Sequence, residues 1–165
     1  MSRVLFDFSA AGSVQGWSAI DDRVMGGASR SRLRHHASGH AVFEGEVSLA
    51  RNGGFASVRC AAQALGQAGA ATCEILARGA PGPFKLNLFT DDGFDSISYQ
   101  CGFAAGAGDW QLIQLPLRSF RARFRGREVP GAPPLDPMRL RQVGLMTAER
   151  RAGPFALDIR RIGLG

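Results

Sequence analysis

Apolar and polar residues alternate along most of this chain, in short segments separated by glycine or proline. The segment 3–9 places Val4, Phe6 and Phe8 on one side of an extended backbone, and 41–49 repeats the pattern. A period of two is typical of strands that bury one face. The segments that show it are 3–9, 41–49, 54–60, 71–78, 83–90, 96–103, 110–117, 141–148 and 154–162.

The number and spacing of these segments predict an all-β fold. About ten strands, roughly 8–12 residues apart, are typical of a β-sandwich, and a jelly roll of two antiparallel sheets is the simplest arrangement. Helical signal is scarce: 61–70 contains two glycines and indicates a loop, whereas Asp136 and Pro137 favour the start of a short helix within 134–142. The length of 165 residues predicts a single domain, 1–165.

The net charge of +6 belongs to the C-terminal third of the chain. Residues 1–117 carry 9 basic and 10 acidic side chains, whereas 118–165 carry 11 basic and 4 acidic ones. The 19 arginines against one lysine, with abundant alanine and glycine, are typical of a GC-rich coding sequence. Because basicity alone is weak evidence and stacking aromatics do not interleave on a basic face, we do not expect nucleic-acid binding.

The three cysteines predict neither a disulfide framework nor a zinc site. Cys60, Cys73 and Cys101 are odd in number, have no C-x-x-C spacing and lack a nearby histidine pair, so we expect reduced, buried thiols. An acid at Asp7 comes too early for a signal peptide, and no apolar run approaches the ~18 residues of a membrane span. We expect a soluble, cytoplasmic protein without a metal or cofactor.

The stretch IDDRVMGGASRSR, residues 20–32, is the first candidate site. Its carboxylates suit a divalent cation and its glycine N–H groups suit an anion, but it lacks the Gly-Lys-Ser/Thr of a phosphate loop and the G-x-G-x-x-G of a dinucleotide loop. We favour a structural corner over a ligand or partner site, and place catalysis last. The candidate residues are Asp21, Asp22, Arg23, Met25, Gly26 and Gly27.

A second glycine pair lies at 52–54. Asn52 and the two glycines that follow it suit a tight turn, so we expect a hairpin there and a strand after it. Arg59 lies on that strand, and an arginine in a sandwich usually pairs with a carboxylate. We expect its partner to be Asp21 or Asp22. If that pair is buried, Asp22→Ala or Arg59→Ala lowers stability by roughly 2 kcal/mol or more.

Two other groups of residues have both a structural and a functional interpretation. His35, His36 and His40 surround Ser38 and Gly39, which indicates an exposed hairpin turn more than a metal site. Tyr99 and Trp110 could form a sugar-stacking platform, but both alternate with apolar neighbours and are expected in the core.

The segment 90–100 holds Asp91, Asp92 and Asp95 around Gly93. This spacing resembles half of a calcium loop but lacks the glutamate that closes one. We therefore expect a solvated turn, with weak calcium binding as the alternative.

The strongest charge pattern is RSFRARFRGR, residues 118–127. An extended chain here gives a basic face that suits phosphate or an acidic protein partner, or else an edge that resists aggregation. The basic face has Arg121, Arg123, Arg125 and Arg127, and the opposite face has Phe120, Ala122 and Phe124.

Several of these stretches together resemble the complex I intermediate-associated protein 30 family. They are Trp17, DDRVMGGAS (21–29), FEGEVSL (43–49), NGGFASVR (52–59), SYQCGF (98–103), WQLIQLPLRSF (110–120), FRGR (124–127) and GPFALDIRRI (153–162). The resemblance implies a galactose-binding-domain-like β-sandwich. It also implies an assembly role, because the mitochondrial member assists respiratory complex I through protein contacts. Relatives fused to Rossmann-like domains are known, and this chain resembles a short bacterial member. Where an RGDG turn is expected, residues 78–82 read RGAPG.

These observations favour a non-catalytic protein-binding or assembly module, with a respiratory-complex subunit or assembly factor as the expected partner. The alternative is a β-sandwich that binds carbohydrate or another small ligand at one end. A hydrolase ranks third, since it requires Asp21 or Asp22 to face Glu44 or Glu46 across a cleft, about 5–10 Å apart.

Overall fold

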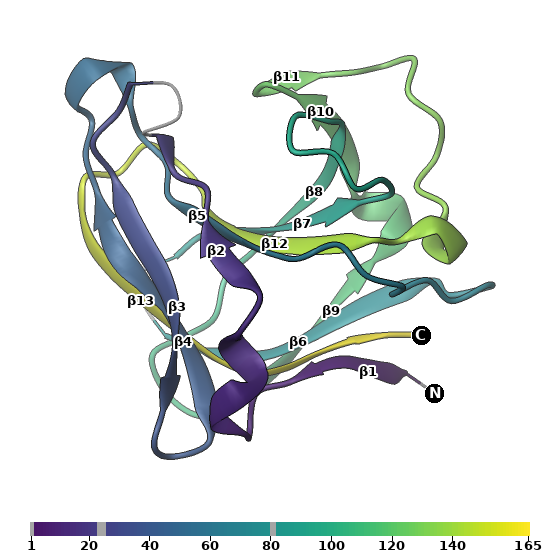
Figure 1. Ribbon diagram of the computed structural model, residues 1–165, viewed down its shortest axis with the longest axis horizontal. Coiled ribbons are helices and arrows are strands. Elements are labelled where there is room, and N and C mark those ends of the chain that lie inside the picture. The colour runs from purple at the N-terminus through teal and green to yellow at the C-terminus, as the bar shows by residue number, and fades with distance from the viewer. Residues whose placement is uncertain (1, 23–25, 80–81) are drawn as a thin grey trace.

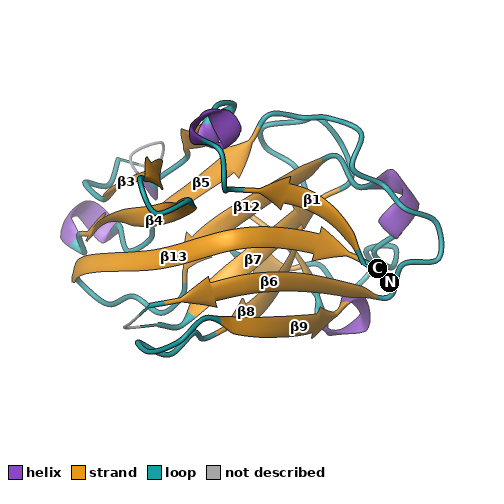
Figure 2. Ribbon diagram, turned by 90° about the horizontal axis from the view of Figure 1, so that it is seen from below, coloured by secondary structure: helices purple, strands orange, loops and turns teal. Residues whose placement is uncertain are grey.

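The computed structural model describes residues 2–22, 26–79 and 82–165 and shows two antiparallel sheets packed face to face. Figure 2 shows the two layers, with the first sheet in front of the second. The first sheet has the order β3 (Arg30–His36), β4 (His40–Val47), β13 (Gly153–Leu164), β6 (Thr72–Arg78) and β9 (Gln111–Pro116), and β1 (Arg3–Asp7) also pairs with β13.

The second sheet has seven strands. Their order is β11 (Arg127–Glu128), β10 (Arg121–Phe124), β8 (Ser98–Phe103), β7 (Phe84–Phe89), β12 (Gln142–Thr147), β5 (Ser57–Cys60) and β2 (Trp17–Ala19). Figure 1 shows this sheet curving, so that β10 and β11 rise on one side of β7 and β12 while the ends of β2 and β5 rise on the other.

The described helices are all single 3₁₀ turns. They are η1 (Ala11–Val14), η3 (Ala50–Asn52), η4 (Leu117–Ser119) and η5 (Pro137–Arg139). The helix start predicted at Asp136 and Pro137 is confirmed as η5, because the Asp136 carboxylate accepts a hydrogen bond from the Met138 N–H. None of these helices is long and apolar enough to cross a membrane.

The core fills the space between the two sheets. Phe43 from the first sheet and Phe84 from the second are buried and meet edge to face, with their ring centroids 6.1 Å apart. Phe155 of β13 packs on both rings. Each strand therefore buries alternate side chains, and the remaining ones form the two outer faces on which a binding site can lie.

The predicted jelly-roll β-sandwich is confirmed, and every segment that alternates in the sequence contains a strand. The hairpin predicted at 52–54 is wrong. Strand β4 pairs with β3 and β13, whereas β5 pairs with β12 and β2, so the chain crosses here from one sheet to the other. The hairpin predicted between His36 and His40 is confirmed, since β3 and β4 pair on either side of it.

Candidate functional site

The two carboxylates of the 20–32 stretch are buried and accept hydrogen bonds from the chain itself. Asp21 is 7% exposed and Asp22 is 1% exposed. The Asp21 carboxylate accepts hydrogen bonds from the Ser31 N–H (3.0 Å) and hydroxyl (2.5 Å), and from the Ser57 N–H (2.9 Å). Because Ser31 lies on the edge strand β3 of the first sheet and Ser57 on β5 of the second, this carboxylate joins the two sheets.

Asp22 makes the second half of the same junction. Its carboxylate accepts from the Ser29 N–H (2.9 Å) and hydroxyl (2.6 Å), from the Gly54 N–H (2.7 Å) and from the Phe55 N–H (3.3 Å). We call Asp21, Asp22 and these donors the Asp21–Asp22 latch. Apart from Ser31, its donors come from 21–29 and 52–59, two of the stretches of sequence that carry the family resemblance.

Two glycines leave room for the Asp22 carboxylate. A Cβ atom on Gly27 would lie 2.5 Å from the carboxylate carbon, and one on Gly53 would lie 2.5 Å from Oδ2. Any side chain at either position therefore displaces the carboxylate from its donors. Each of the two glycine pairs thus leaves space for the same buried carboxylate.

The hydrogen bonds determine the protonation of Asp22. Burial raises its pKa, but the hydrogen bonds from Ser29, Gly54 and Phe55 outweigh burial, and the pKa of Asp22 is lowered below its usual value. Among the described residues, the carboxylate is therefore held ionised by hydrogen-bond donors and not by an arginine. The Asp21 and Asp22 carboxylates thus contact donors of the chain itself, in keeping with the structural corner favoured from the sequence. Gly26 is exposed with φ +89°, and Arg23, Met25 and the Asn52 side chain lie outside the described residues.

The predicted partner of Arg59 is wrong. Arg59 does not reach the latch, because it points out of the sandwich: Val58 and Cys60, its neighbours on β5, are the residues that enter the core. Its guanidinium stacks 3.9 Å from the centre of the Phe89 ring and donates to the Phe94 carbonyl oxygen at 3.0 Å. Burial lowers the pKa of this guanidinium from its usual value.

The basic face predicted for 118–127 is also wrong as a single stripe. Arg125 has φ +50° and forms a turn, so β11 folds back on β10 with Arg127 opposite Phe124. Arg125 pairs with Asp95, and Arg123 approaches Glu128 at 3.9 Å. Arg121 remains on the outer face of β10, opposite Gln100.

The acids of the 91–95 turn go to separate partners. Asp92 pairs with Arg141 at 2.7 Å, Asp95 pairs with Arg125, and Asp91 accepts from the Gly93 N–H. Among the residues that the structure describes, no three histidine, cysteine, aspartate or glutamate side chains gather as metal ligands would.

The hydrolase arrangement is wrong, since Asp21 and Asp22 are engaged in the latch while Glu44 binds two arginines on an outer face. Tyr99 is buried as predicted, and its hydroxyl donates to the Pro133 carbonyl oxygen. Trp110 is only half-buried: the guanidiniums of Arg78 and Arg160 lie 4.5 Å and 4.4 Å from its ring.

A different group of residues lies on the outer face of the seven-stranded sheet. Strand register places Arg59 next to Gly144, Gly144 next to Asn87, Asn87 next to Gln100, and Gln100 next to Arg121. We call these five residues the Arg59–Arg121 row. The row crosses β5, β12, β7, β8 and β10. It lies on the face of this curved sheet that points away from the core (Figure 1).

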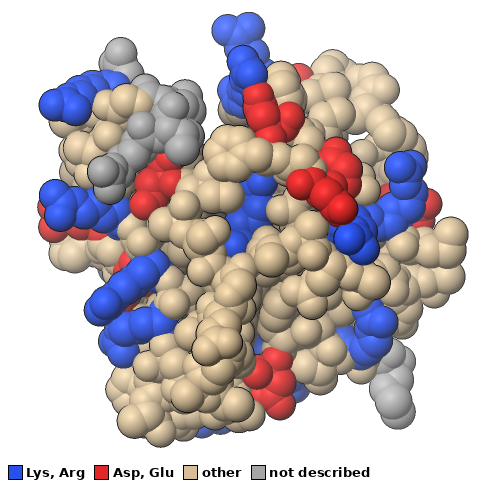
Figure 3. Space-filling view, in the orientation of Figure 1, with Lys and Arg blue, Asp and Glu red and all other residues tan. Residues whose placement is uncertain are grey.

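Three cations of this face, Arg59, Lys85 and Arg121, form no ion pair within the described residues, whereas Arg123 approaches Glu128. Lys85, two residues before Asn87, donates there only to the Gln100 side chain at 3.4 Å. Burial lowers the pKa of Lys85, and Arg123 lowers it further. Figure 3 shows basic side chains over the region of β5, β7 and β12 in the middle of the view, with acidic ones on the rim beside them.

Asn87 lies at the centre of the row with an unused acceptor. The residue is 4% exposed, and its Oδ1 atom has no hydrogen-bond partner in the structure. A buried carbonyl without a donor costs roughly 1–3 kcal/mol. Such a group on the outer face of a sheet suits a ligand that brings the donor.

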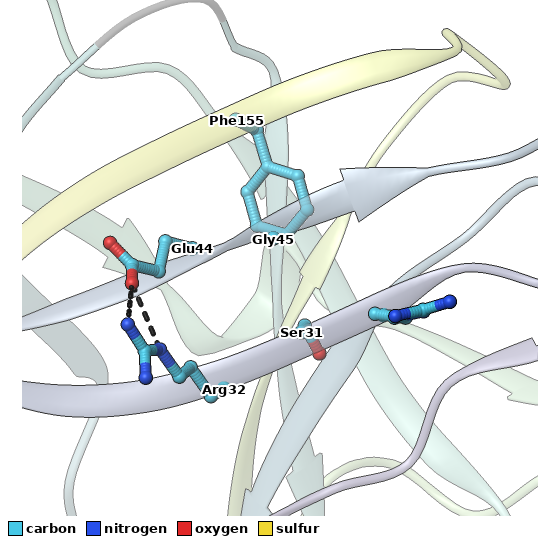
Figure 4. A pocket seen from close by; sticks show the side chains of 6 residues that line it. Ser31, Arg32, Glu44, Gly45 and Phe155 are labelled. Carbon is cyan, nitrogen blue, oxygen red and sulfur yellow. Dashed lines mark hydrogen bonds and ion pairs between the residues drawn. The ribbon is translucent and has the colours of Figure 1, made fainter.

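The outer face of the first sheet provides the contrast. Glu44 accepts from both Arg32 (2.8 Å) and Arg34 (2.9 Å), and Asp158 accepts from Arg78 (2.9 Å). An open depression of about 380 Å³ lies here, and Figure 4 shows the Arg32 guanidinium directed at Glu44 on its wall. It is lined by Arg30, Ser31, Arg32, Glu44, Gly45 and Phe155. Glu44 and Asp158 are therefore both ion-paired on this face, whereas Arg30 forms no ion pair within the described residues.

The sequence contained a signal for the row that our prediction did not use. In 83–90 the polar Lys85 and Asn87 alternate with buried Phe84, Leu86 and Leu88. Alternation indicates that both polar side chains face outward, but only the register shows that Arg59, Gln100 and Arg121 lie beside them.

The fold defines a class of β-sandwich to which known binding modules belong. The structure is similar to the family 11 carbohydrate-binding module of a cellulosomal cellulase of Clostridium thermocellum, with a TM-score of 0.71 and 16% identity over 99% of this chain and 94% of the module. It is also similar to part of an exo-β-agarase, with a TM-score of 0.63 and 11% identity over 99% of this chain and 25% of the enzyme. At these identities the likeness shows the fold alone.

The chain belongs to the complex I intermediate-associated protein 30 (CIA30) family, whose model matches residues 6–159. This confirms the family resemblance found in the sequence. No protein with a curated description matches the sequence.

Proposed function

We propose that this protein is a non-catalytic binding module that holds a protein partner in an assembly intermediate of respiratory complex I. The family name supports the partner class, since it describes proteins associated with complex I intermediates. A role as an assembly chaperone in the cytoplasm is in keeping with three free thiols at Cys60, Cys73 and Cys101.

The observation that carries the proposal is the contrast between the two outer faces. On the first sheet Glu44 pairs with Arg32 and Arg34, and Asp158 pairs with Arg78. On the seven-stranded sheet Arg59, Lys85 and Arg121 form no ion pair within the described residues, and Asn87 Oδ1 has no donor there. Charged groups that have no partner within their own chain can pair with oppositely charged groups of another protein. We therefore place the binding face on the seven-stranded sheet.

The distribution of acids supports a role other than catalysis. General acid–base chemistry on a substrate needs a carboxyl or imidazole group free to exchange a proton. Asp21 and Asp22 have all their hydrogen bonds within the latch, and Glu44, Asp92, Asp95 and Asp158 are ion-paired.

Affinity capture tests the proposal. The full chain is used as bait in a membrane extract of the native cell, and bound proteins are identified by mass spectrometry. We expect the wild type to retain complex I subunits or assembly intermediates, and Arg59→Gln/Arg121→Gln to lose them. Arg161→Gln is the matched control, because Arg161 is an exposed arginine on β13 of the other sheet. The same set of captured proteins for all three baits would contradict the proposed binding face.

Carbohydrate binding is the second candidate function. Asn87 Oδ1 favours it, since a sugar hydroxyl is a suitable donor, and the similar module from Clostridium thermocellum is a carbohydrate-binding one. A thermal-shift screen against neutral and acidic oligosaccharides tests it, because a ligand at 100 times its Kd adds ~2.7 kcal/mol to the free energy of unfolding. A screen without any stabilisation would contradict this candidate.

A further inference from the structure

We infer that the Arg59–Arg121 row binds an extended acidic segment of the partner protein, with two carboxylate side chains four residues apart. This inference rests on the proposed function and specifies the chemistry that its binding face recognises.

The position of the Arg59 guanidinium fixes one end of the site. Although its backbone is on β5, the side chain crosses β12 and stacks on Phe89 of β7. Gly144 lies between them and has no side chain to obstruct the crossing; a Cβ there would contact the Asn87 side chain at 3.6 Å and the Phe89 ring at 3.7 Å. The charge of Arg59 therefore lies above β7.

The distance to Arg121 fixes the other end. From β7 the row continues over β8 to β10, which is two strand spacings or roughly 10 Å. The exposed Arg121 side chain extends this range by a few ångströms. An extended peptide advances about 3.3 Å per residue and presents every second side chain on the same side, so residues i and i+4 lie about 13 Å apart and face the sheet together.

The middle of the row suits a peptide backbone. Asn87 is the third of the five residues of the row and lies on β7, at the Arg59 end of the span, and its buried Oδ1 is an acceptor without a donor among the described residues. We expect a backbone N–H of the segment to reach this atom by displacing the side chains that bury it. Gly102, opposite Lys85 on β8, leaves the adjacent position open. At the rim, Phe94 is 61% exposed next to Arg59 and provides an apolar contact.

The charge of the ligand follows from the charge of the face. Arg59, Lys85 and Arg121 are three cations that form no ion pair within the described residues, although the charge of Asp91 acts on Arg59. A neutral segment would leave them uncompensated, and a basic one would be repelled. Carboxylates are the complementary groups, and with guanidiniums they form two parallel hydrogen bonds.

Fluorescence anisotropy with synthetic peptides tests the inference. The probe is a labelled twelve-residue peptide of serine and glycine with two glutamates four residues apart; glutamine replaces both in the matched peptide. We expect the glutamate peptide to bind the full chain about tenfold more tightly, and to weaken as salt rises. Arg121→Gln and Asn87→Ala each weaken binding by about fivefold, whereas Arg161→Gln changes it by less than about twofold.

Three results would overturn the inference. The first is equal affinity for the two peptides, and the second is an equal loss in Arg161→Gln. The third is binding of an oligogalacturonate or of a neutral cello-oligosaccharide but not of the glutamate peptide, which would assign the row to a saccharide. Affinity capture separates this test from the proposed function: if complex I proteins are captured through the row but the peptides fail, only the acidic-segment inference is wrong.

Discussion

The Asp21–Asp22 latch and the Arg59–Arg121 row are both polar regions of one β-sandwich, but only the latch is complete. Every carboxylate of the latch is hydrogen-bonded by the chain, at distances between 2.5 Å and 3.3 Å. Among the described residues, the row has two arginines that form no ion pair and an amide carbonyl without a donor. A polar group satisfied from within stabilises the fold, whereas one left unsatisfied is available to a ligand.

The comparison predicts that removing a latch carboxylate has the largest effect on stability. Asp22→Ala leaves the N–H groups of Ser29, Gly54 and Phe55 without an acceptor, and we expect the free energy of unfolding to fall by about 2 kcal/mol or more. Urea denaturation measures it. The control is Asp95→Ala, which breaks an exposed ion pair and costs less than about 1 kcal/mol. Equal losses would contradict the latch.

Filling the space beside the carboxylate has the next largest effect. Gly27→Ala places a Cβ 2.5 Å from the Asp22 carboxylate carbon, so the carboxylate must shift away from its donors. We expect a loss of about 2 kcal/mol. Gly12→Ala is the control, since a Cβ there meets no atom within 4 Å. Thermal melts of the two variants measure the difference. If the Asp22 carboxylate is closely surrounded, Gly27→Ala melts at a lower temperature than Gly12→Ala; if the loop can adjust, the two variants melt together.

Acid weakens the latch for the same reason. The pKa of Asp22 is lower in the folded chain than in the unfolded one, so its contribution is present above the unfolded pKa of about 3.9 and is lost as the pH falls through the folded pKa. We expect the stability of the wild type to fall more steeply below about pH 4 than that of Asp22→Ala. Denaturation curves between pH 2 and about pH 6 measure both slopes, and parallel slopes would show that other carboxylates dominate.

Substitution of Arg59 tests whether a residue of the row contributes to stability as a latch residue does. A buried ion pair with Asp21 or Asp22 predicted a loss of roughly 2 kcal/mol, but Arg59 instead stacks on Phe89. We expect Arg59→Gln to cost only about 1 kcal/mol, the strength of a cation–π contact. The double variant Asp22→Ala/Arg59→Gln should show additive losses, as distant sites do. A coupling energy well above about 0.5 kcal/mol would instead indicate an ion pair between the two residues.

The smallest effect on stability is expected at Asn87. Asn87→Ala removes the carbonyl that lacks a donor, so the free energy of unfolding changes by less than about 1 kcal/mol despite the burial of the residue. Chemical denaturation measures the change, and Asn87→Ala also weakens peptide binding. A loss as large as that of Asp22→Ala would indicate that Asn87 belongs to the scaffold.

Much of the fold could be predicted from the sequence, and rather little of the site. Alternation revealed the long strands, whereas β2 is too short for a periodic signal and β3 is interrupted by charged residues. The latch was predicted as a corner, but its donors were not, because Ser31 and Ser57 meet Asp21 only through the packing of two sheets. Arg59 was placed on a strand correctly and given the wrong partner, since its direction depends on whether Val58 and Cys60 take the inner face.

Residues far apart in the sequence form the row for the same reason. Asn87 and Gln100 are neighbours only because β7 pairs with β8, and Arg121 joins them through the pairing of β10 with β8. The turn at Arg125 and Gly126, both at positive φ, could not be seen in the pattern of arginines and phenylalanines. Register and turn conformation, both set by tertiary contacts, are therefore what the sequence pattern left undetermined.

The most direct test of the account is to map where an acidic ligand binds. Backbone amide shifts of the ¹⁵N-labelled chain are followed as the glutamate peptide is added. We predict that the largest changes fall on β5, β7, β8, β10 and β12 around Arg59, Asn87 and Arg121, and that Gly27, Gly54 and the strands β4, β6 and β13 change little. Changes centred on the 20–32 loop or on the depression at Glu44 would contradict the central claim, because they would place the binding site away from the Arg59–Arg121 row.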